Sequence, residues 1–324
     1  MSGSIESPVG QRPKAGFIVG PTGVGKTATA IALAKRLGAE IVNADSRQIF
    51  RGLDIGTAKP SWADRARVAH HLIDVREPDQ PLDVARFGMM AEAAITDITS
   101  RGKRPIVAGG SGLYLKVLRH GIFNGPGASS KLRAELADIA DRLGVDHLYQ
   151  ELRKVDPAAA ARIEPRDTYR IMRAIEVFRL TGIPISQHQE AHRRTARTRA
   201  SLTIGLELPR ARLYESIDRR FDEMIANGLI DEVRGLIAAG FHPEMPPLST
   251  IGYKHTAAYL RGELNLQDAI ALAKRETRRL AKRQLTWFRR DREIVWVDAE
   301  LGYQQALALL ETFFAEPRAM AAFE

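Results

Sequence analysis

Strand-like and helical patterns alternate along the first 120 residues of the chain. Short apolar runs at 16–19, 40–44 and 104–108 predict buried strands. Helical spacing of apolar residues predicts helices over 27–37 and 84–101. This alternation is typical of a parallel sheet whose faces are covered by helices, so we expect an α/β fold.

The pattern changes in the middle of the chain. From residue 122 to about 199 it is helical and interrupted by Gly and Pro, whereas 201–207 again resembles a buried strand. Helical spacing dominates after that strand. We therefore predict an α/β core formed by residues 1–121 and 200–324, with an all-helical insert domain over 122–199.

Composition excludes several classes of protein. The 324 residues include 44% hydrophobic and 27% charged residues, which is ordinary for a globular protein. The absence of cysteine excludes disulfides and thiolate metal sites. Because no apolar stretch approaches the roughly 20 residues of a membrane span, and the first 14 residues are polar, we expect a cytoplasmic protein without a membrane partner. We also expect it to act as a monomer.

The net charge of +9 is concentrated near the C-terminus. Between 274 and 292 there are nine Lys or Arg residues against two acidic ones. In a helix, four of them share one face, namely Arg275, Arg278, Lys282 and Arg289. That face is either a solvated helix surface or a site for a phosphate backbone. A second basic cluster at 193–199 favours an anionic polymer as the partner.

The first strand leads into Gly20-x4-Gly25-Lys26-Thr27, the phosphate-binding loop motif. Its glycines allow successive backbone N–H groups to converge on phosphate oxygens, and Lys26 adds a positive charge. The Thr27 hydroxyl is placed to bind Mg²⁺, and the following helix directs its positive end at the same anion. The motif therefore predicts a polyphosphate site with Mg²⁺ as cofactor, without showing which phosphate compound is bound.

Two polar residues follow other strands of the predicted sheet. Asp45 stands at the carboxyl end of the second strand, where it is a catalytic base, an Mg²⁺ ligand or an Asx cap. Ser111 follows two glycines and precedes a predicted helix, so it is either an N-cap or a hydroxyl in the same pocket. Since ligands of open α/β sheets bind beyond the carboxyl ends of strands, we expect one crevice.

Several strings, in family order over about residues 15–290, resemble those of the bacterial-type tRNA dimethylallyltransferases, also called tRNA isopentenyltransferases. The phosphate-binding loop at 20–27 is generic, whereas the strings at 54–60 and 281–289 are the most specific. They are Gly20-Pro-Thr-Gly-Val-Gly-Lys-Thr27, Asp45-Ser-Arg-Gln-Ile-Phe50, Asp54-Ile-Gly-Thr-Ala-Lys-Pro60, His71-Leu-Ile-Asp74, Gly109-Gly-Ser-Gly-Leu-Tyr114, Arg173-Ala-Ile-Glu-Val-Phe178, Gly252-Tyr-Lys254 and Ala281-Lys-Arg-Gln-Leu-Thr-Trp-Phe-Arg289.

The resemblance implies transfer of a dimethylallyl group from dimethylallyl diphosphate to the N6 amine of the adenosine at tRNA position 37, beside the anticodon. It implies Asp45 as the base that takes the amine proton, with Ser111 as its catalytic companion. It assigns the diphosphate to Gly20, Thr22, Gly23, Val24, Gly25, Lys26, Thr27 and Arg220.

The same resemblance implies that the helical insert grips the anticodon stem-loop. It assigns contacts with the tRNA to Asp45, Ser46, Arg47, Gln48, Ser111, Arg133, Tyr169, Arg170, Arg173, Tyr253, Lys254, Lys282, Arg283 and Arg289. The chain departs from the frequent family residues at Phe50, Ser111, Arg166 and Leu280. Ser111 replaces a threonine and so keeps the hydroxyl.

Two other functions are compatible with these motifs. An ATP-dependent small-molecule kinase would use the same loop and a carboxylate after the second strand. However, the strand at 104–108 ends in Gly-Gly-Ser without an acidic Mg²⁺ ligand. A nucleotide-switched RNA-binding protein would also have a phosphate-binding loop and basic segments.

Overall fold

The computed structural model describes residues 12–123, 125–195 and 199–316. The chain divides into two compact units. The first, Met1–Arg119 with Thr198–Glu324, is termed the core unit, and the second, His120–Arg197, the helical unit. Each is described by itself.

The core unit is built on a six-stranded sheet in which all pairings are parallel. Its strand order is β3-β2-β4-β1-β5-β6, with bounds β1 Ala15–Val19, β2 Ala39–Asn43, β3 His70–His71, β4 Arg104–Gly109, β5 Ser201–Glu207 and β6 Ile294–Asp298. Val19 of β1 pairs with Gly109 and Gly205, so the central strands end together. The predicted parallel α/β core is confirmed, whereas the edge strand β6 was not predicted.

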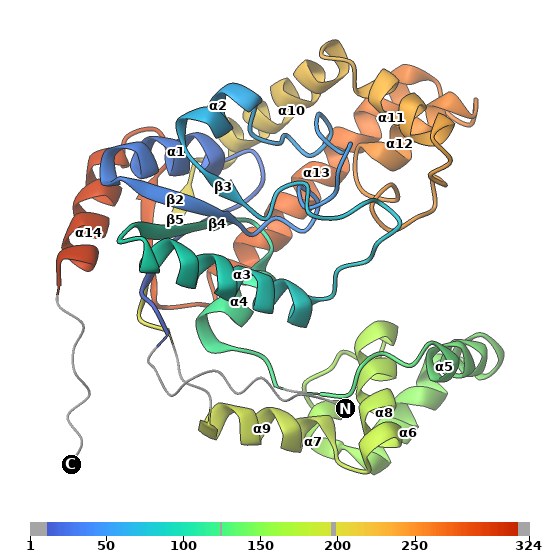
Figure 1. The fold of residues 1–324 in the computed structure, drawn as a ribbon. Helices are drawn as coiled ribbons and strands as arrows, with labels where there is room; N and C mark the ends of the chain where they lie inside the picture. The colour runs from blue at the N-terminus through green and yellow to red at the C-terminus, as the bar shows by residue number, and fades with distance from the viewer. Residues whose placement is uncertain (1–11, 124, 196–198, 317–324) are drawn as a thin grey trace, which may run out of the picture. The chain divides into compact units, whose positions relative to one another are not determined.

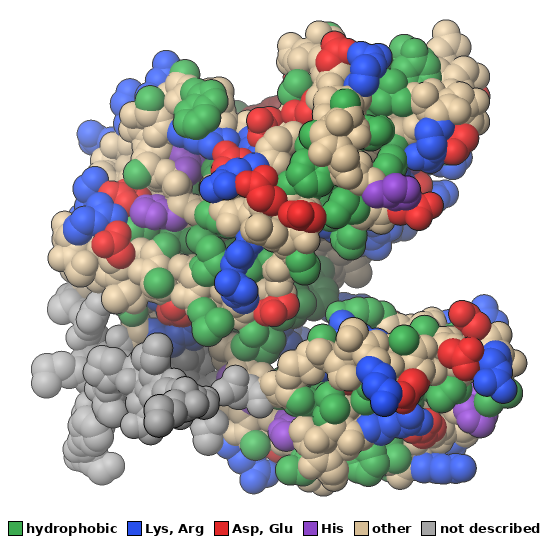
Figure 2. All heavy atoms as spheres, turned by 45° about the vertical axis from the view of Figure 1, so that its right-hand side comes forward, with side chains coloured by type: hydrophobic (Ala, Val, Ile, Leu, Met, Phe, Trp, Pro, Cys, Tyr) green, Lys and Arg blue, Asp and Glu red, His purple; other side chains and the backbone are tan. Residues whose placement is uncertain are grey.

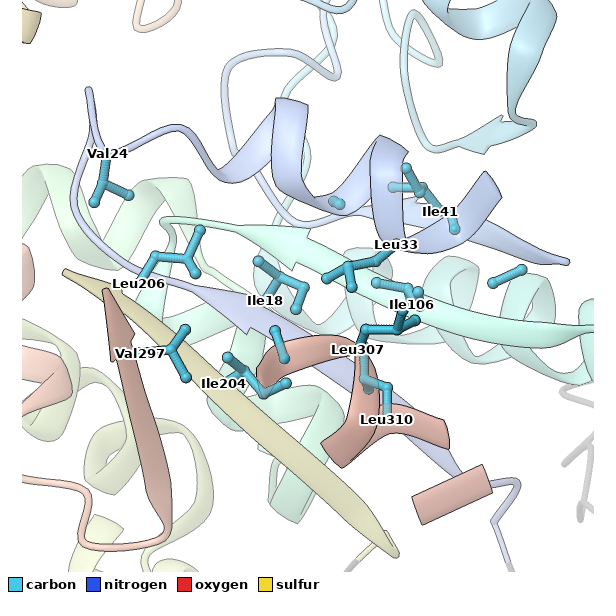
Figure 3. Packing of buried hydrophobic residues seen from close by; sticks show 14 of the residues in the cluster. Ile18, Val24, Leu33, Ile41, Ile106, Ile204, Leu206, Val297, Leu307 and Leu310 are labelled. Atoms are coloured by element: carbon cyan, nitrogen blue, oxygen red, sulfur yellow. The ribbon is translucent and has the colours of Figure 1, made fainter. Parts of the chain in front are cut away.

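Alternating side chains of the strands divide the core into two layers. Ile18 points into a cluster with α1 and α14, while Phe17 and Val19 pack against α3 and α4 on the other face. The bounds of these helices are α1 Lys26–Leu37, α3 Val84–Ser100, α4 Gly112–His120 and α14 Tyr303–Ala315. Figure 1 shows the helices on both faces, and Figure 3 shows Ile18 and Leu33 in the first layer. Each fully buried Ile or Leu contributes roughly 1.5–3 kcal/mol to folding.

A third apolar cluster joins four later helices to the segment 49–58. These helices are α10 Arg210–Ala226, α11 Leu229–Ala238, α12 Tyr253–Leu260 and α13 Leu266–Phe288; the short α2 is Trp62–Arg67. Helices α10 and α13 are also joined by ion pairs, Asp218 with Arg278 and Asp222 with Lys274. The cluster therefore packs the segment after β2 against helices from the second half of the chain.

The helical unit contains α5 Ser130–Leu143, α6 Val145–Val155, α7 Pro157–Ala160, α8 Thr168–Thr181 and α9 Ile185–Thr195. Leu136, Leu148, Leu152 and Ile175 are fully buried in its own apolar core. Helix α8 begins where the Asp167 carboxylate accepts the Arg170 N–H, a standard N-cap. The unit therefore has a core of its own.

Charges of both signs cover the molecular surface. On the face in Figure 2, Lys and Arg side chains lie next to Asp and Glu side chains in each unit, in keeping with the many ion pairs between them. Among the helices that the structure describes, none combines the length and apolarity needed to span a bilayer.

Candidate active site

Two adjoining cavities lie at the carboxyl ends of the central strands of the core unit. The larger has a volume of about 530 Å³ and the smaller about 90 Å³. Both are lined by Thr22, Asp45, Thr57, Arg220 and Gln284. Because five residues belong to both, the cavities meet, and the predicted crevice beyond the strand ends is present.

The phosphate-binding loop, residues 20–27, follows β1 into this crevice. Gly20, Gly23 and Gly25 have φ values of 147°, 85° and 96°, which other residues rarely adopt. A Cβ on Gly20 would also lie 2.7 Å from the Leu206 carbonyl oxygen. No side chain caps the first turn of α1, so its N–H groups are available to an anion.

Side chains from α10 and α13 fix the shape of this loop. Gln284 accepts the Thr22 N–H at 2.8 Å and donates to the Gly110 carbonyl at 3.0 Å, which joins the loop to the turn after β4. Ser216 donates to the Gly23 carbonyl at 2.7 Å, and Val24 is buried in the core. Hydrogen bonds from Gln284 and Ser216, together with the burial of Val24, therefore fix the loop.

Gln284 lines both cavities and fixes the loop, although the sequence indicated no role for it. It is half-buried and lies on the same face of α13 as the buried Thr277, Ala281 and Phe288. An amide on the apolar face of a long helix was the available signal, because a buried amide needs hydrogen-bond partners.

Two cations stand beside the loop. Loss of hydration lowers the pKa of Lys26 to about 8, although the Asp45 carboxylate opposes that shift, and its Nζ donates to the Pro21 carbonyl at 2.8 Å. Burial also lowers the pKa of Arg220, again opposed by Asp45, and Arg220 donates to the Thr22 hydroxyl at 2.6 Å. Both side chains line the smaller cavity, which is suited to an anion.

Asp45 forms the predicted Asx cap and also lines both cavities. Its Oδ1 accepts the Arg47 N–H at 2.8 Å, which is an Asx cap, and its own N–H donates to Asn43 at 3.2 Å. Among the described residues, Oδ2 has no hydrogen-bond partner. Because the half-buried side chain lines both cavities, the cap leaves one carboxylate oxygen for chemistry.

Ser111 is joined to the loop that contains Asp45. Its Oγ accepts the Ser46 N–H at 3.1 Å, and both serines line the larger cavity. This hydrogen bond differs from a plain N-cap, in which the hydroxyl would accept an N–H from the first turn of α4. Ser111 therefore ties the turn after β4 to the segment after β2.

Arg47 and Lys254 contribute positive charge to the larger cavity. Burial lowers the pKa of Arg47, with the Asp45 charge opposing it, and Arg47 donates to the Pro246 carbonyl at 3.3 Å. Lys254 forms an ion pair of 2.7 Å with Glu276. Both cations thus have partners within the protein.

The segment 54–60 closes the crevice and is held by a carboxylate that the sequence analysis missed. Glu232 accepts the N–H groups of Asp54, Ile55 and Gly56 at 3.0, 2.7 and 3.2 Å. It also accepts the Tyr253 hydroxyl at 2.5 Å. Tyr253 is only 1% exposed. The Tyr253 side chain therefore supports this segment, and its expected contact with the tRNA stays a prediction.

Gln48 has a similar position. It is buried, lines the smaller cavity and donates to the carbonyls of Thr57 and Ala58 at 3.0 and 3.1 Å. Its amide nitrogen therefore fixes the same segment, and its predicted contact with the RNA depends on the remaining amide oxygen.

On the predicted basic face of α13, some residues form ion pairs within the protein and others have none among the described residues. Arg278 makes a bidentate ion pair with Asp218, at 2.8 and 2.6 Å, so its charge is paired within the protein, and its contact with a phosphate backbone stays a prediction. Lys282 and Arg283 are exposed and have no ion pair among the described residues, and Arg283 lines the larger cavity. Arg289 lies 3.4 Å from Glu207.

The second basic cluster, 193–199, is partly paired with carboxylates of the protein. Residues 196–198 lie outside the described residues. Arg199 is buried and forms an ion pair with Glu92, while Arg193 and Arg194 pair with Glu190. Arg199 therefore does not contribute to an exposed basic surface, whereas the exposed Arg193 and Arg194 share one carboxylate and keep a net charge of +1.

The remaining predicted residues lie on α5 and α8 of the helical unit. Arg133 and Arg173 both contact Glu176, and Tyr169 is 72% exposed. Arg170 is exposed and lies 3.4 Å from Asp167. These residues occur in one unit by themselves, and the cavities described above belong to the core unit.

The smaller cavity has oxygen ligands that suit Mg²⁺. Thr27 and Asp45 both line it. Mg²⁺ binds few protein groups and keeps water and phosphate oxygens as its other ligands, so a hydroxyl and a carboxylate beside a phosphate site fit this ion. Among the described residues, no cluster of three or more His, Asp or Glu side chains forms a closed metal site.

Comparison with known proteins identifies the family of the chain. A family model described as IPP transferase matches residues 48–291. The tRNA dimethylallyltransferase 1 of Pelobacter propionicus is 49% identical over 302 residues, covering 93% of this chain and 98% of that protein. The solved tRNA isopentenylpyrophosphate transferase of Bacillus halodurans is 40% identical, with a TM-score of 0.68 over 93% of this chain and 95% of its own. A solved eukaryotic dimethylallyltransferase acting on tRNA is 28% identical, with a TM-score of 0.77 over 95% of this chain and 81% of its own. The chain therefore belongs to the IPP transferase family.

Proposed function

We propose that this protein transfers a dimethylallyl group from dimethylallyl diphosphate to the N6 amine of the adenosine at position 37 of tRNA, with release of diphosphate. The observation that supports this function most is the meeting of two cavities at Asp45, one beside the phosphate-binding loop and the other larger. The relatives named above are tRNA dimethylallyltransferases and a tRNA isopentenylpyrophosphate transferase.

The donor diphosphate is assigned to the smaller cavity. The N–H groups of the phosphate-binding loop, Lys26 and Arg220 all favour an anion there. Thr27 would hold Mg²⁺, which supplies further neutralisation of the diphosphate charge when it is bound. Neutralisation matters because diphosphate leaves readily only when its developing charge is stabilised.

The adenine is assigned to the larger cavity. Its exocyclic amine is a poor nucleophile, because the lone pair is delocalised into the ring, so a base must accept a proton as the bond forms. Oδ2 of Asp45, which has no hydrogen-bond partner among the described residues, is proposed to accept this proton. The N6–C1 bond forms, the C1–O bond of the donor breaks, the electron pair leaves with diphosphate, and the amine proton moves to Asp45.

The RNA must present its base out of the stack. Extrusion of a base costs a few kcal/mol, and this cost is smallest in a single-stranded loop. An anticodon loop is therefore a suitable substrate. Lys282 and Arg283 supply unpaired positive charge near the larger cavity, which Arg283 lines. The insert is proposed to bind the anticodon stem-loop through Arg133, Tyr169, Arg170 and Arg173.

Transfer of label tests the function. The protein, Mg²⁺, unmodified tRNA and dimethylallyl diphosphate labelled in its allyl group are incubated together, and a parallel reaction contains ATP with small-molecule acceptors. We expect label in the tRNA, recovered as a modified adenosine after digestion. ATP turnover without label in the tRNA would reject the proposal in favour of a kinase.

A further inference from the structure

A buried carboxylate binds two arginines in the helical unit. Glu176 of α8 is 0% exposed. It accepts Nε and Nη2 of Arg133 at 2.9 and 3.1 Å, Nη1 of Arg173 at 2.6 Å and the Ser129 N–H at 2.9 Å. We term Tyr169, Arg133, Arg173 and Glu176 the Glu176 surface. Its members come from two helices, α5 and α8.

The carboxylate is ionised in this position. Burial favours a higher pKa for Glu176, but the hydrogen bonds from Arg133, Arg173 and the Ser129 N–H outweigh it and hold the pKa below its ordinary value. A buried pair of this kind is a poor source of net stability, because desolvation offsets the attraction between the charges. Fixing the geometry of its two arginines is a role that does not depend on net stability.

The arginines are oriented by this carboxylate. Arg133 uses two donors on Glu176, and Arg173 uses Nη1 on Glu176 and Nη2 on the Pro126 carbonyl at 2.8 Å. Their side chains nevertheless remain 38% and 25% exposed. The three charged groups have a net charge of +1, and the guanidinium planes are fixed before any ligand arrives.

The exposed neighbour completes a surface suited to nucleic acid. Tyr169 precedes Arg173 by four residues, so the two share a face of α8. Tyr169 is 72% exposed, so its ring is accessible to a ligand. Aromatic rings stack on unpaired bases, and oriented guanidinium groups bind phosphates through paired N–H donors.

We propose that Glu176 is a positioning residue for RNA binding: it holds Arg133 and Arg173 in the orientation in which they contact phosphates, beside the stacking surface of Tyr169. This inference deepens the proposed function and rests on it for the identity of the ligand. It gives a role to a residue that never touches the RNA.

Two explanations predict opposite effects of removing the charge. Glu176→Gln makes the protein more positive by one unit. If charge alone governs binding, the affinity for tRNA increases. If orientation governs it, the affinity falls, because the amide N–H of Gln cannot accept from the guanidinium groups.

The test measures tRNA binding by filter retention at several salt concentrations, together with thermal unfolding and the KM for dimethylallyl diphosphate. We expect Glu176→Gln to raise the Kd by roughly tenfold, similar to the loss of a supporting hydrogen bond at metal sites. The KM for the donor stays unchanged. Equal or tighter tRNA binding by a folded Glu176→Gln protein would overturn the inference.

Glu151→Gln is the matched control. Glu151 of α6 also makes a bidentate contact with an arginine of α8, Arg179, and belongs to the same unit. The substitution changes the net charge by the same amount away from the Glu176 surface. We expect its tRNA Kd to equal or fall slightly below that of the wild type, and a rise equal to that of Glu176→Gln contradicts the specific role of Glu176.

If Glu176→Gln unfolds the unit, a second variant, Arg133→Lys, tests the inference. Arg133→Lys keeps the charge at a partly exposed position and loses the bidentate fork. We expect weaker tRNA binding, and an unchanged Kd overturns the inference. If wild-type protein binds tRNA but transfers no label, the proposed reaction fails while this binding comparison still stands by itself.

Discussion

The core crevice and the Glu176 surface each combine cationic side chains with a carboxylate, but the carboxylate lines the cavities in the first and is fully buried in the second. In the crevice, the cations Lys26 and Arg220 are half-buried in the wall, and the carboxylate of Asp45 lines both cavities. In the helical unit, the carboxylate of Glu176 is buried and its arginines are partly exposed.

The difference indicates what each carboxylate can do. Asp45 has one oxygen in an Asx cap and one without a partner among the described residues, so it can accept a proton. Glu176 has both oxygens occupied by arginines and a backbone N–H, so it can only organise them. The same side-chain chemistry thus serves reaction in one unit and geometry in the other.

The largest effect is expected from Asp45. Asp45→Asn keeps an oxygen for the Arg47 N–H but cannot take a proton, whereas Asp45→Ala loses both roles. We expect both variants to lower kcat by roughly 10²–10⁴, with little change in tRNA affinity. Steady-state and single-turnover rates of label transfer measure this. Near-normal turnover by Asp45→Asn together with an inactive Asp45→Ala would show that Asp45 is only a cap.

A smaller effect is expected from the protonation of Lys26. Since its pKa is lowered to about 8, Lys26 loses its charge as the pH rises through that value. Binding of the donor anion should then weaken, with kcat/KM for dimethylallyl diphosphate falling about tenfold for each pH unit above it. A pH profile of kcat/KM measures this, with Lys26→Arg as a variant that remains charged. A flat profile up to pH 10 contradicts the assigned contact between Lys26 and the diphosphate.

The smallest effect is expected from the exposed cations of α13. Lys282→Ala with Arg283→Ala should reduce the salt dependence of tRNA binding by about 0.7–0.9 in slope for each phosphate that the variant no longer neutralises. Arg278→Ala is the matched control because Arg278 is paired with Asp218, so its slope should change less. If Arg278→Ala alters the slope as much as the double variant, pairing does not decide which cations meet the RNA.

Local sequence patterns predicted the parts of the site that depend on local geometry. The glycines of residues 20–27 have positive φ values, and Asp45 follows a buried strand. Because both segments come directly after parallel strands, their positions in the sequence were enough to predict that they share one crevice. The central strands and the helices around them were predicted for the same reason. The edge strand β6 was missed because it follows a long helix without the earlier alternation.

The partners of charged side chains could not be predicted from local pattern. Arg278 and Arg199 fall in basic segments of the sequence, but carboxylates 60 and 107 residues away neutralise them. Glu232 resembles any acidic residue in the first turn of a helix, yet it binds three N–H groups from a distant segment. Such pairings depend on tertiary packing, which spacing along the chain does not contain.

The central claim is that donor and adenine meet at Asp45, between the two cavities. A crystal structure of the protein with a non-reactive thiodiphosphate analogue of the donor and an anticodon stem-loop tests it most directly. The account predicts phosphates on the N–H groups of residues 20–27 and on Lys26, with the allylic carbon and the adenine amine on either side of the Asp45 carboxylate. Phosphates bound away from that loop, or an adenine that does not enter the larger cavity, would contradict it.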